Sequence, residues 1–140
     1  MSAPTRTVRD CAVLDFPKQS DPRGNLTFVE GERHVPFDIR RIFYLYDVPA
    51  GGSRGAHAHR TLQQCLICVS GTFEVALDDG RHRDRVLLDR PWKGLLVPPM
   101  IWAAEENFAP GTVCLVLTSD LYREDDYVRD YAQFLRLAQA

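Results

Sequence analysis

Short segments of alternating apolar and polar residues, separated by turn signals, run through most of this chain. The segment 39–47, IRRIFYLYD, is rich in β-branched and aromatic residues and predicts a strand. The turn sequence DDG at 78–80 predicts a hairpin between strands at 72–77 and 83–89. About ten short strands with a turn every 8 to 12 residues are typical of a β-sandwich or a small barrel. We therefore expect an all-β fold.

The remaining predicted strands are one that holds His57 and His59, and others at 8–16, 26–30, 64–69, 92–97, 101–105 and 112–119. Only the end of the chain, from Arg123 onward, has helical periodicity. Its apolar stripe consists of Tyr127, Tyr131, Phe134 and Leu135. Asp120 is the predicted cap of this helix, and acidic residues 124–126 suit the positive end of its dipole. We expect the stripe to pack on the outside of the barrel.

The length of 140 residues predicts a single domain over residues 1–140. The chain is 45% hydrophobic and 26% charged with a net charge of −2, so no basic field favours nucleic acid or an anionic membrane. No apolar run approaches the roughly 18 residues of a membrane span, and the start, MSAPTRTVRD, lacks the apolar region of a signal peptide. We therefore expect a cytoplasmic protein that binds neither nucleic acid nor membrane.

The four cysteines lie in strand-like contexts. Cys65 and Cys68 have the spacing of a redox or zinc motif, but an offset of three on a strand points the two thiols to opposite faces. Cys11 and Cys114 supply no second pair to complete a zinc site. The sequence therefore predicts buried free thiols, which fit a reducing compartment.

His57 and His59 stand one residue apart in a predicted strand, and successive side chains on a strand alternate faces. Both imidazoles are thus expected on one face, after a glycine-rich loop and Arg54. Neutral imidazole, with a reference pKa of about 6.5, accepts or donates a proton near neutral pH. The pair predicts an acid/base site or a metal site, and the alternative is a hydrogen-bonded core pair.

The spacing around this pair resembles the first signature of the cupin superfamily, whose double-stranded β-helix (jelly-roll) barrel usually holds a metal with two histidines, a glutamate and a later histidine. The matching residues are Gly51-x5-His57-x-His59-x4-Gln64-x6-Gly71 and, for the second signature, Gly94, Pro98, Met100, Ala103 and Asn107. In this alignment Gln64 takes the glutamate position and Ala103 the third histidine position. Two imidazoles and a neutral amide form a weak metal site. We therefore expect no metal and no other cofactor.

A closer resemblance, to the sugar-nucleotide 3,4-ketoisomerases, extends over nearly the whole chain. The matching pieces are RGNLTF (23–28), PFDIRRIFYLYDVP (36–49), RGAHAHR (54–60), Gln64, VSG (69–71), LDDG (77–80), PPMIW (98–102) and SDLYREDDYVRDYAQFL (119–135). These enzymes are cupins that act on dTDP-4-keto-6-deoxyglucose, so the resemblance implies an isomerase of a dTDP-linked keto-deoxyhexose. It also implies that His57 and His59 are the catalytic pair, and that the protein is a homodimer that exchanges an N-terminal strand, here near 8–16.

The implied reaction moves a ketone from C4 to C3 through an enediolate, and the developing charge on oxygen needs hydrogen-bond donors or cations. The candidates for substrate binding are Arg41, Tyr44, Tyr46, Arg54, Gln64 and Trp102. The arginines suit the diphosphate or the enediolate, and Gln64 is expected to point inward from the vacated ligand position. Trp102 is expected to cover the cavity mouth or stack on thymine. For each of these residues a core or surface role is the alternative.

Strand 39–47 presents Arg41 on one face and both Tyr44 and Tyr46 on the other, and the sequence leaves open which face lines the cavity. Two other functions remain open as well. One is a 3,5-epimerase-like enzyme that uses a single histidine with a tyrosine, and the other is a non-catalytic sugar-binding cupin. The paired histidines favour the ketoisomerase.

Overall fold

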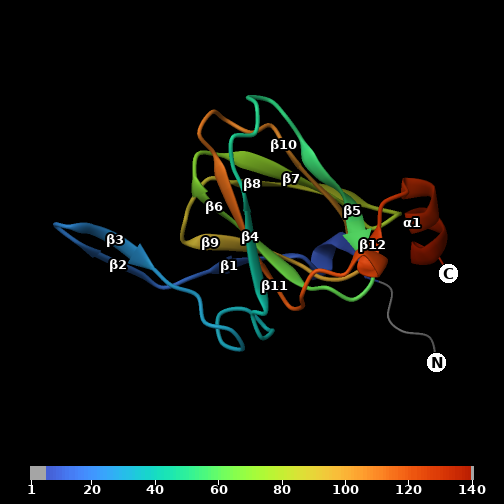
Figure 1. The fold of residues 1–140 in the computed structure, drawn as a ribbon, viewed down its shortest axis with the longest axis horizontal. Coiled ribbons are helices and arrows are strands. Elements are labelled where there is room, and N and C mark those ends of the chain that lie inside the picture. Colours follow the sequence, from blue (N-terminus) through green and yellow to red (C-terminus); the bar gives the residue numbers. More distant parts are fainter. Residues whose placement is uncertain (1–5, 140) are drawn as a thin grey trace.

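The computed structural model describes residues 6–139, which form two five-stranded antiparallel sheets packed face to face (Figure 1). The first sheet has the strand order β1 (Ala12–Asp15), β9 (Lys93–Val97), β6 (Gln64–Ser70), β11 (Val113–Thr118) and β4 (Arg41–Leu45). The second has the order β12 (Tyr127–Val128), β5 (Arg54–His59), β10 (Trp102–Glu106), β7 (Phe73–Asp78) and β8 (Arg83–Leu88). The sequence-order neighbours β4, β5 and β6 thus alternate between the sheets, as in a jelly-roll, and the predicted all-β architecture is confirmed.

The core fills the space between the sheets, because alternate side chains of facing strands point inward. Leu66 of β6, Phe73 of β7 and Val116 of β11 are fully buried in it. Cys68 belongs to the same cluster, whereas Cys65 lies in a second cluster on the other face of β6. The predicted opposite orientation of these two thiols is confirmed, and all four cysteines of the chain are free, with only Cys11 partly exposed.

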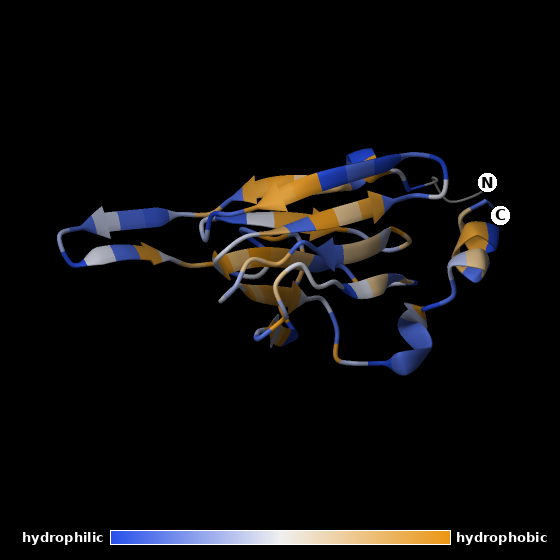
Figure 2. Ribbon diagram, turned by 90° about the horizontal axis from the view of Figure 1, so that it is seen from above, coloured by the Kyte–Doolittle hydropathy of each residue, from blue (hydrophilic) through white to orange (hydrophobic). Residues whose placement is uncertain are grey.

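The N-terminal region differs from the single strand predicted at 8–16. Residues Val8–Asp10 form a short 3-10 turn that is capped by the Thr7 side chain. Within the predicted segment, the strand is limited to β1. In this chain β1 pairs with β9, so exchange of this strand between subunits stays a prediction. Next along the chain, β2 (Lys18–Asp21) and β3 (Gly24–Thr27) form a hairpin with its turn at 22–23, and this hairpin projects beyond the sandwich (Figures 1 and 2).

The predicted helix from Arg123 was placed too early. Residues Glu124–Asp126 form a 3-10 turn (η2), and Tyr127–Val128 form β12, whose backbone is bonded to β5 and so is unavailable to a helix. Helix α1 (Tyr131–Ala138) begins after Asp130, the actual cap, whose side chain accepts a hydrogen bond from the Gln133 amide. Its residue Phe134 packs against the outer face of the second sheet, as predicted. No helix within residues 6–139 is long and apolar enough to cross a membrane.

Candidate active site

His57 and His59 project from the same face of β5, as the alternation predicts. Their rings meet edge to face, with centroids 5.0 Å apart and planes at 89°. His57 is half-buried and lines a cavity, whereas His59 lies deeper and is only 5% exposed. Burial, reinforced by the proximity of His59, lowers the pKa of His57 from 6.5 to about 4. His57 is therefore a neutral imidazole at neutral pH, and it can accept a proton.

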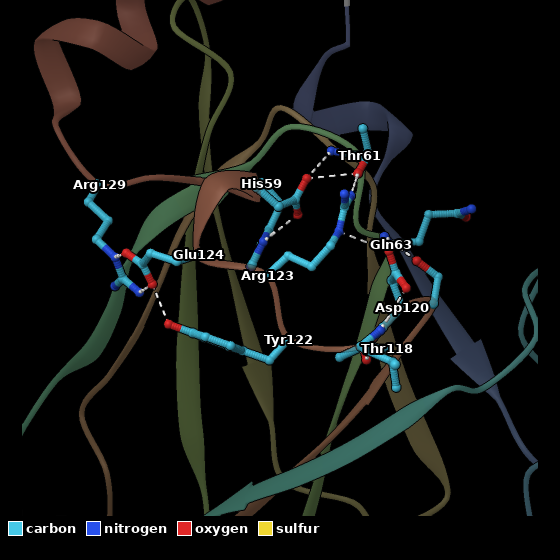
Figure 3. A network of polar contacts seen from close by, with 12 residues as sticks. His59, Thr61, Gln63, Thr118, Asp120, Tyr122, Arg123, Glu124 and Arg129 are labelled. Atoms are coloured by element: carbon cyan, nitrogen blue, oxygen red, sulfur yellow. Dashed lines mark hydrogen bonds and ion pairs between the residues drawn. The ribbon is translucent and has the colours of Figure 1, made fainter.

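His59 is held by Asp126, the last residue of the η2 turn. The Nδ1 atom of His59 lies 3.0 Å from Oδ2 of Asp126, and Oδ1 of Asp126 accepts hydrogen bonds from the backbone amide and hydroxyl of Thr61 at 2.8 and 2.7 Å (Figure 3). Burial alone would raise the pKa of Asp126, but the hydrogen bonds from Thr61 and His59 lower it, so the carboxyl is ionised. Burial is also the main cause that lowers the pKa of His59, against the opposing effect of Asp126. A neutral His59 therefore donates its Nδ1–H to the carboxylate, which leaves Nε2 as a proton acceptor.

Tyr127 of β12 packs on both histidines, with ring centroids 4.9 Å from His57 and 4.4 Å from His59. The guanidinium of Arg129 lies over the ring of Tyr127, 4.1 Å from its centroid. Hydrogen bonds to Glu124 at 2.8 and 3.0 Å hold this guanidinium in place (Figure 3). The segment after η2 thus forms one wall of the site. Sequence reasoning missed these residues because it assigned the segment to a helix.

The cavity beside His57 has a volume of about 360 Å³ and opens between the two sheets. The residues that line it are Phe43, Leu45, Arg54, Gly55, Ala56, His57, Gln64, Glu105, Tyr127 and Arg129. Two predicted substrate-binding residues, Arg54 and Gln64, are thus brought to the histidine. Gln64 is 7% exposed and points inward, as its place in the cupin alignment implies. Arg54 is exposed at the cavity wall, where its charge is open to an anionic group.

Arg41 lies close to the site without lining the cavity. Its Nε is 3.4 Å from Oγ1 of Thr118, and its guanidinium lies 5.3 Å from the Phe43 ring centroid and 5.6 Å from that of Tyr122. Its positive charge is one of the smaller influences, after burial, on the lowered pKa of His59. The side chain is half-buried, so it combines a position near the histidines with access to solvent.

The other three predicted substrate-binding residues are not at this cavity. Phe43 and Leu45 turn one face of β4 toward it, so Tyr44 and Tyr46 are on the opposite face, where they are 59% and 61% exposed. Trp102 lies on the outer face of the second sheet, because its neighbour Ala103 on β10 points inward. There it contacts the rings of α1, with centroids 5.2 Å from Tyr131 and 5.6 Å from Phe134.

Glu105 of β10 is the second acidic residue that sequence reasoning missed. It lines the cavity, is 8% exposed, and its Oε2 has no hydrogen-bond partner among residues 6–139. Burial raises its pKa from 4.5 to about 7, although its own backbone amide and the charge of Arg54 act in the other direction. Ala103 takes a metal-ligand position in the cupin alignment, which implies that it points inward. Residues two apart on a strand share a face, so Glu105 points inward as well.

The side chains of this site do not fit a metal ion. The glutamate and third histidine positions of the cupin ligand set hold Gln64 and Ala103, and Ala103 has no donor atom. Between residues 6 and 139, no group of three His, Cys, Asp or Glu residues lies close enough together to hold a metal. No catalytic step is therefore derived through a metal.

Comparison with known proteins assigns the chain to a family. The family model FdtA, described as "WxcM-like, C-terminal", matches residues 9–139. The chain belongs to this family. A curated relative supports this assignment: the TDP-4-oxo-6-deoxy-alpha-D-glucose-3,4-oxoisomerase of Aneurinibacillus thermoaerophilus is 41% identical to this chain over 122 residues. The alignment covers 87% of this chain and 88% of the relative.

Solved structures agree with the FdtA assignment. A 3,4-ketoisomerase from Helicobacter canadensis superposes with a TM-score of 0.91 at 42% identity, covering 94% of this chain and 98% of the other. A histidine-to-asparagine mutant of the 3,4-ketoisomerase QdtA from Thermoanaerobacterium thermosaccharolyticum, in complex with TDP-4-keto-6-deoxyglucose, gives 0.93 at 34% identity, covering 95% and 96%. The expected cupin fold is confirmed, and this FdtA-family chain is an isomerase.

Proposed function

We propose that this isomerase moves the ketone of a TDP-linked 4-keto-6-deoxyhexose from C4 to C3 by acid/base catalysis, without a metal. The relatives named above are 3,4-ketoisomerases, and one of them binds TDP-4-keto-6-deoxyglucose. The observation that carries the proposal is the pair of neutral histidines, one on the cavity wall and one held behind it by a carboxylate. Such a pair suits proton transfer between two adjacent carbons.

His57 is the base in this mechanism. The C3 proton of the substrate is acidic because it is α to the C4 carbonyl, and the neutral imidazole on the cavity wall accepts it. The electrons of the C3–H bond form an enediolate across C3 and C4. The same imidazolium then returns a proton to C4, while the proton of the O3 hydroxyl passes to O4, so that C3 becomes the ketone and C4 carries the hydroxyl.

His59 supports this transfer from behind. Its Nδ1–H is fixed on Asp126, so its Nε2 is the free acceptor, and its ring touches that of His57. The deeper histidine thus orients the first and accepts or supplies a proton in relay. Asp126 stays ionised throughout and stabilises positive charge that develops on His59.

The negative charge of the enediolate falls on oxygen, and stabilising it requires donors on the cavity wall. Arg54, Gln64 and Arg129 provide such groups around His57. The two arginines also suit the diphosphate of the nucleotide, because the guanidinium fork matches phosphate oxygens. The other predicted substrate-binding residues lie outside this cavity: Arg41, Tyr44, Tyr46 and Trp102. In this proposal they contact substrate only where the nucleotide extends beyond the cavity or where a second subunit contributes to the site.

A homodimer is the proposed assembly, and the outer face of the first sheet is its proposed interface. Ile42, Tyr44 and Val69 are large apolar or aromatic residues exposed on this face, and Ile42 and Val69 line a pocket together with Lys18 and Thr27 of the β2–β3 hairpin. Adjacent exposed apolar side chains of this kind mark interaction sites. A homodimer is expected in sedimentation equilibrium, and Ile42→Glu is expected to give a monomer. We also place the protein in the cytoplasm, where its free thiols would remain reduced.

The experiment that tests the function is incubation with TDP-4-keto-6-deoxyglucose in heavy water, followed by carbon and proton NMR of the product. A ketoisomerase gives a carbonyl at C3 and a hydroxyl at C4. A 3,5-epimerase leaves the carbonyl at C4 and exchanges the hydrogens at C3 and C5, and a sugar-binding protein leaves the substrate unchanged. Either of the last two results would overturn the proposal.

A further inference from the structure

The cavity wall that contains His57 has an irregularity in its sheet. Ala103 of β10 pairs with His57, but Glu105, two residues later, pairs with Arg54, three residues earlier on β5. The extra residue forms a β-bulge, and bulges of this kind re-aim side chains near active sites. Gly55 lies within the bulge with φ 77°, a conformation that glycine adopts readily.

The bulge makes room for the carboxyl group of Glu105. A Cβ atom at position 55 would collide with Oε2 of Glu105, so any larger residue there would have to displace this side chain. The glutamate is 8% exposed, and its Oε2 has no hydrogen-bond partner within the described residues. A buried carboxyl without a partner is costly when ionised and is therefore kept only where it has a use.

The groups around Glu105 do not neutralise a carboxylate by direct contact. On β5 they are Arg54, which is exposed and acts on Glu105 only through its charge, and His57, which is neutral. On β11 the neighbour is Cys114, a thiol whose pKa is raised by burial and which stays protonated. Tyr127 and Arg129 face the same cavity from the wall after η2, but Arg129 is already paired with Glu124.

We propose that Glu105 is a substrate-binding acid, whose neutral carboxyl group donates a hydrogen bond to an oxygen at the C3–C4 end of the hexose. The proposal rests on the ketoisomerase function proposed above. It follows from the position of Glu105 on the cavity wall that contains His57, and from the unpartnered oxygen that the bulge encloses.

A neutral carboxyl group suits this position better than a carboxylate. The oxygens at C3 and C4 become negative in the enediolate, so a protonated acid stabilises them and an ionised one repels them. Burial raises the pKa of Glu105 to about 7, so the group is largely protonated below neutral pH and ionises above it. Loss of the proton at higher pH is thus expected to weaken both binding and turnover.

The test is the pH profile of kcat/KM for the wild type, Glu105→Gln and Glu105→Leu, with Glu106→Gln as the matched control. Glu106 is the next residue but points to the outer face, where it pairs with Arg85 at 2.9 Å. Because the amide of glutamine donates a hydrogen bond at every pH, we expect Glu105→Gln to keep activity and to lose the decline above about pH 7. Glu105→Leu is expected to lose at least tenfold at pH 6, and the control to follow the wild type.

Two results would overturn the inference: a wild-type alkaline decline that Glu105→Gln leaves in place, or a Glu105→Leu variant as active as the wild type at pH 6. A direct titration of Glu105 by NMR, with its carboxyl carbon labelled, checks folding and protonation independently of turnover. If the wild type forms no C3 ketone at any pH, the proposed function has failed. If it does so and Glu105 titrates near pH 4.5, only this inference has failed.

Discussion

The Nδ1 atom of His59 lies 3.0 Å from Oδ2 of Asp126, and both side chains are almost completely buried. The hydrogen bond joins β5 to the η2 turn, which are 67 residues apart in the sequence. Because Thr61 occupies the other carboxylate oxygen with two hydrogen bonds, Asp126 cannot rotate away. His59 is thus held in one tautomer and one orientation behind His57.

Replacement of Asp126 is expected to lower kcat more than it changes KM. In Asp126→Asn the amide can present a donor to Nδ1, which favours the wrong tautomer, and we expect kcat to fall on the order of 100-fold or more. Thermal unfolding should also show a loss of roughly 1 to 3 kcal/mol from the broken buried hydrogen bonds. Asp125→Asn, at the exposed neighbouring position, is the control and should behave as the wild type. Normal kcat in Asp126→Asn would contradict the role of this pair.

Both histidines are expected to be essential for turnover. His57→Asn and His59→Asn each remove a proton acceptor, and general acid/base groups typically contribute on the order of 10² to 10⁴ in rate. We expect product formation, followed by NMR, to fall by at least about 100-fold in each variant. Circular dichroism and thermal unfolding should show that both variants fold. If both turned over at the wild-type rate, the pair would have no catalytic role.

The acid side of the pH profile reports on His57. Its pKa is lowered to about 4, so the neutral base is still fully populated at pH 5.5. We expect kcat/KM to show no decline from pH 7 down to about 5.5, whereas a histidine with an ordinary pKa of about 6.5 would already cost most of the activity there. Stopped assays with a buffer series of constant ionic strength give this profile. A decline on the acid side with a midpoint near pH 6.5 would instead indicate a catalytic base that is exposed to solvent.

Protein stability should also depend on pH through Glu105. Its pKa of about 7 in the folded protein lies above the ordinary value of 4.5, so the folded state retains a proton that the unfolded state loses between these values. This carboxyl therefore makes the free energy of unfolding fall as pH rises from about 4.5 to 7, by up to about 3 kcal/mol. Glu105→Gln should gain on the wild type over this range in urea unfolding. Because both proteins contain His57, its opposite contribution cancels in the difference between their free energies of unfolding. A difference that does not change with pH would contradict the raised pKa of Glu105.

Chelators are expected to leave activity unchanged. Gln64 and Ala103 stand where a cupin metal site needs an anionic ligand and a third imidazole, and a site with two imidazoles and an amide binds metal weakly. Activity after dialysis against EDTA should equal the starting activity, and added Zn²⁺ or Mn²⁺ should not raise it. Strong loss with EDTA, reversed by one metal, would restore a metal mechanism.

Much of this architecture follows from local patterns in the sequence. The strand at 39–47 and the hairpin at 78–80 are predicted well because alternation and turn residues act over a few neighbours. The shared face of His57 and His59 has the same origin. The inward position of Gln64 came from alignment with the cupin signature, and the structure agrees with it.

The parts that sequence reasoning missed depend on tertiary contacts. The spacing of Tyr127 and Tyr131 is that of a helix, but Val128 is fully buried and pairs with Ala58, so the backbone there is extended. Asp126 then faces His59 instead of the positive end of a helix. Glu105 was missed because charged residues are rarely buried, and the bulge that accommodates it is visible only in the pairing of two strands.

The most direct test of the account is the fate of deuterium placed at C3 of TDP-4-keto-6-deoxyglucose. If His57 removes that hydrogen, the wild type releases or transfers the deuterium with a primary kinetic isotope effect, and His57→Asn leaves it at C3. Removal of C3 deuterium by His57→Asn at the wild-type rate would contradict the central claim.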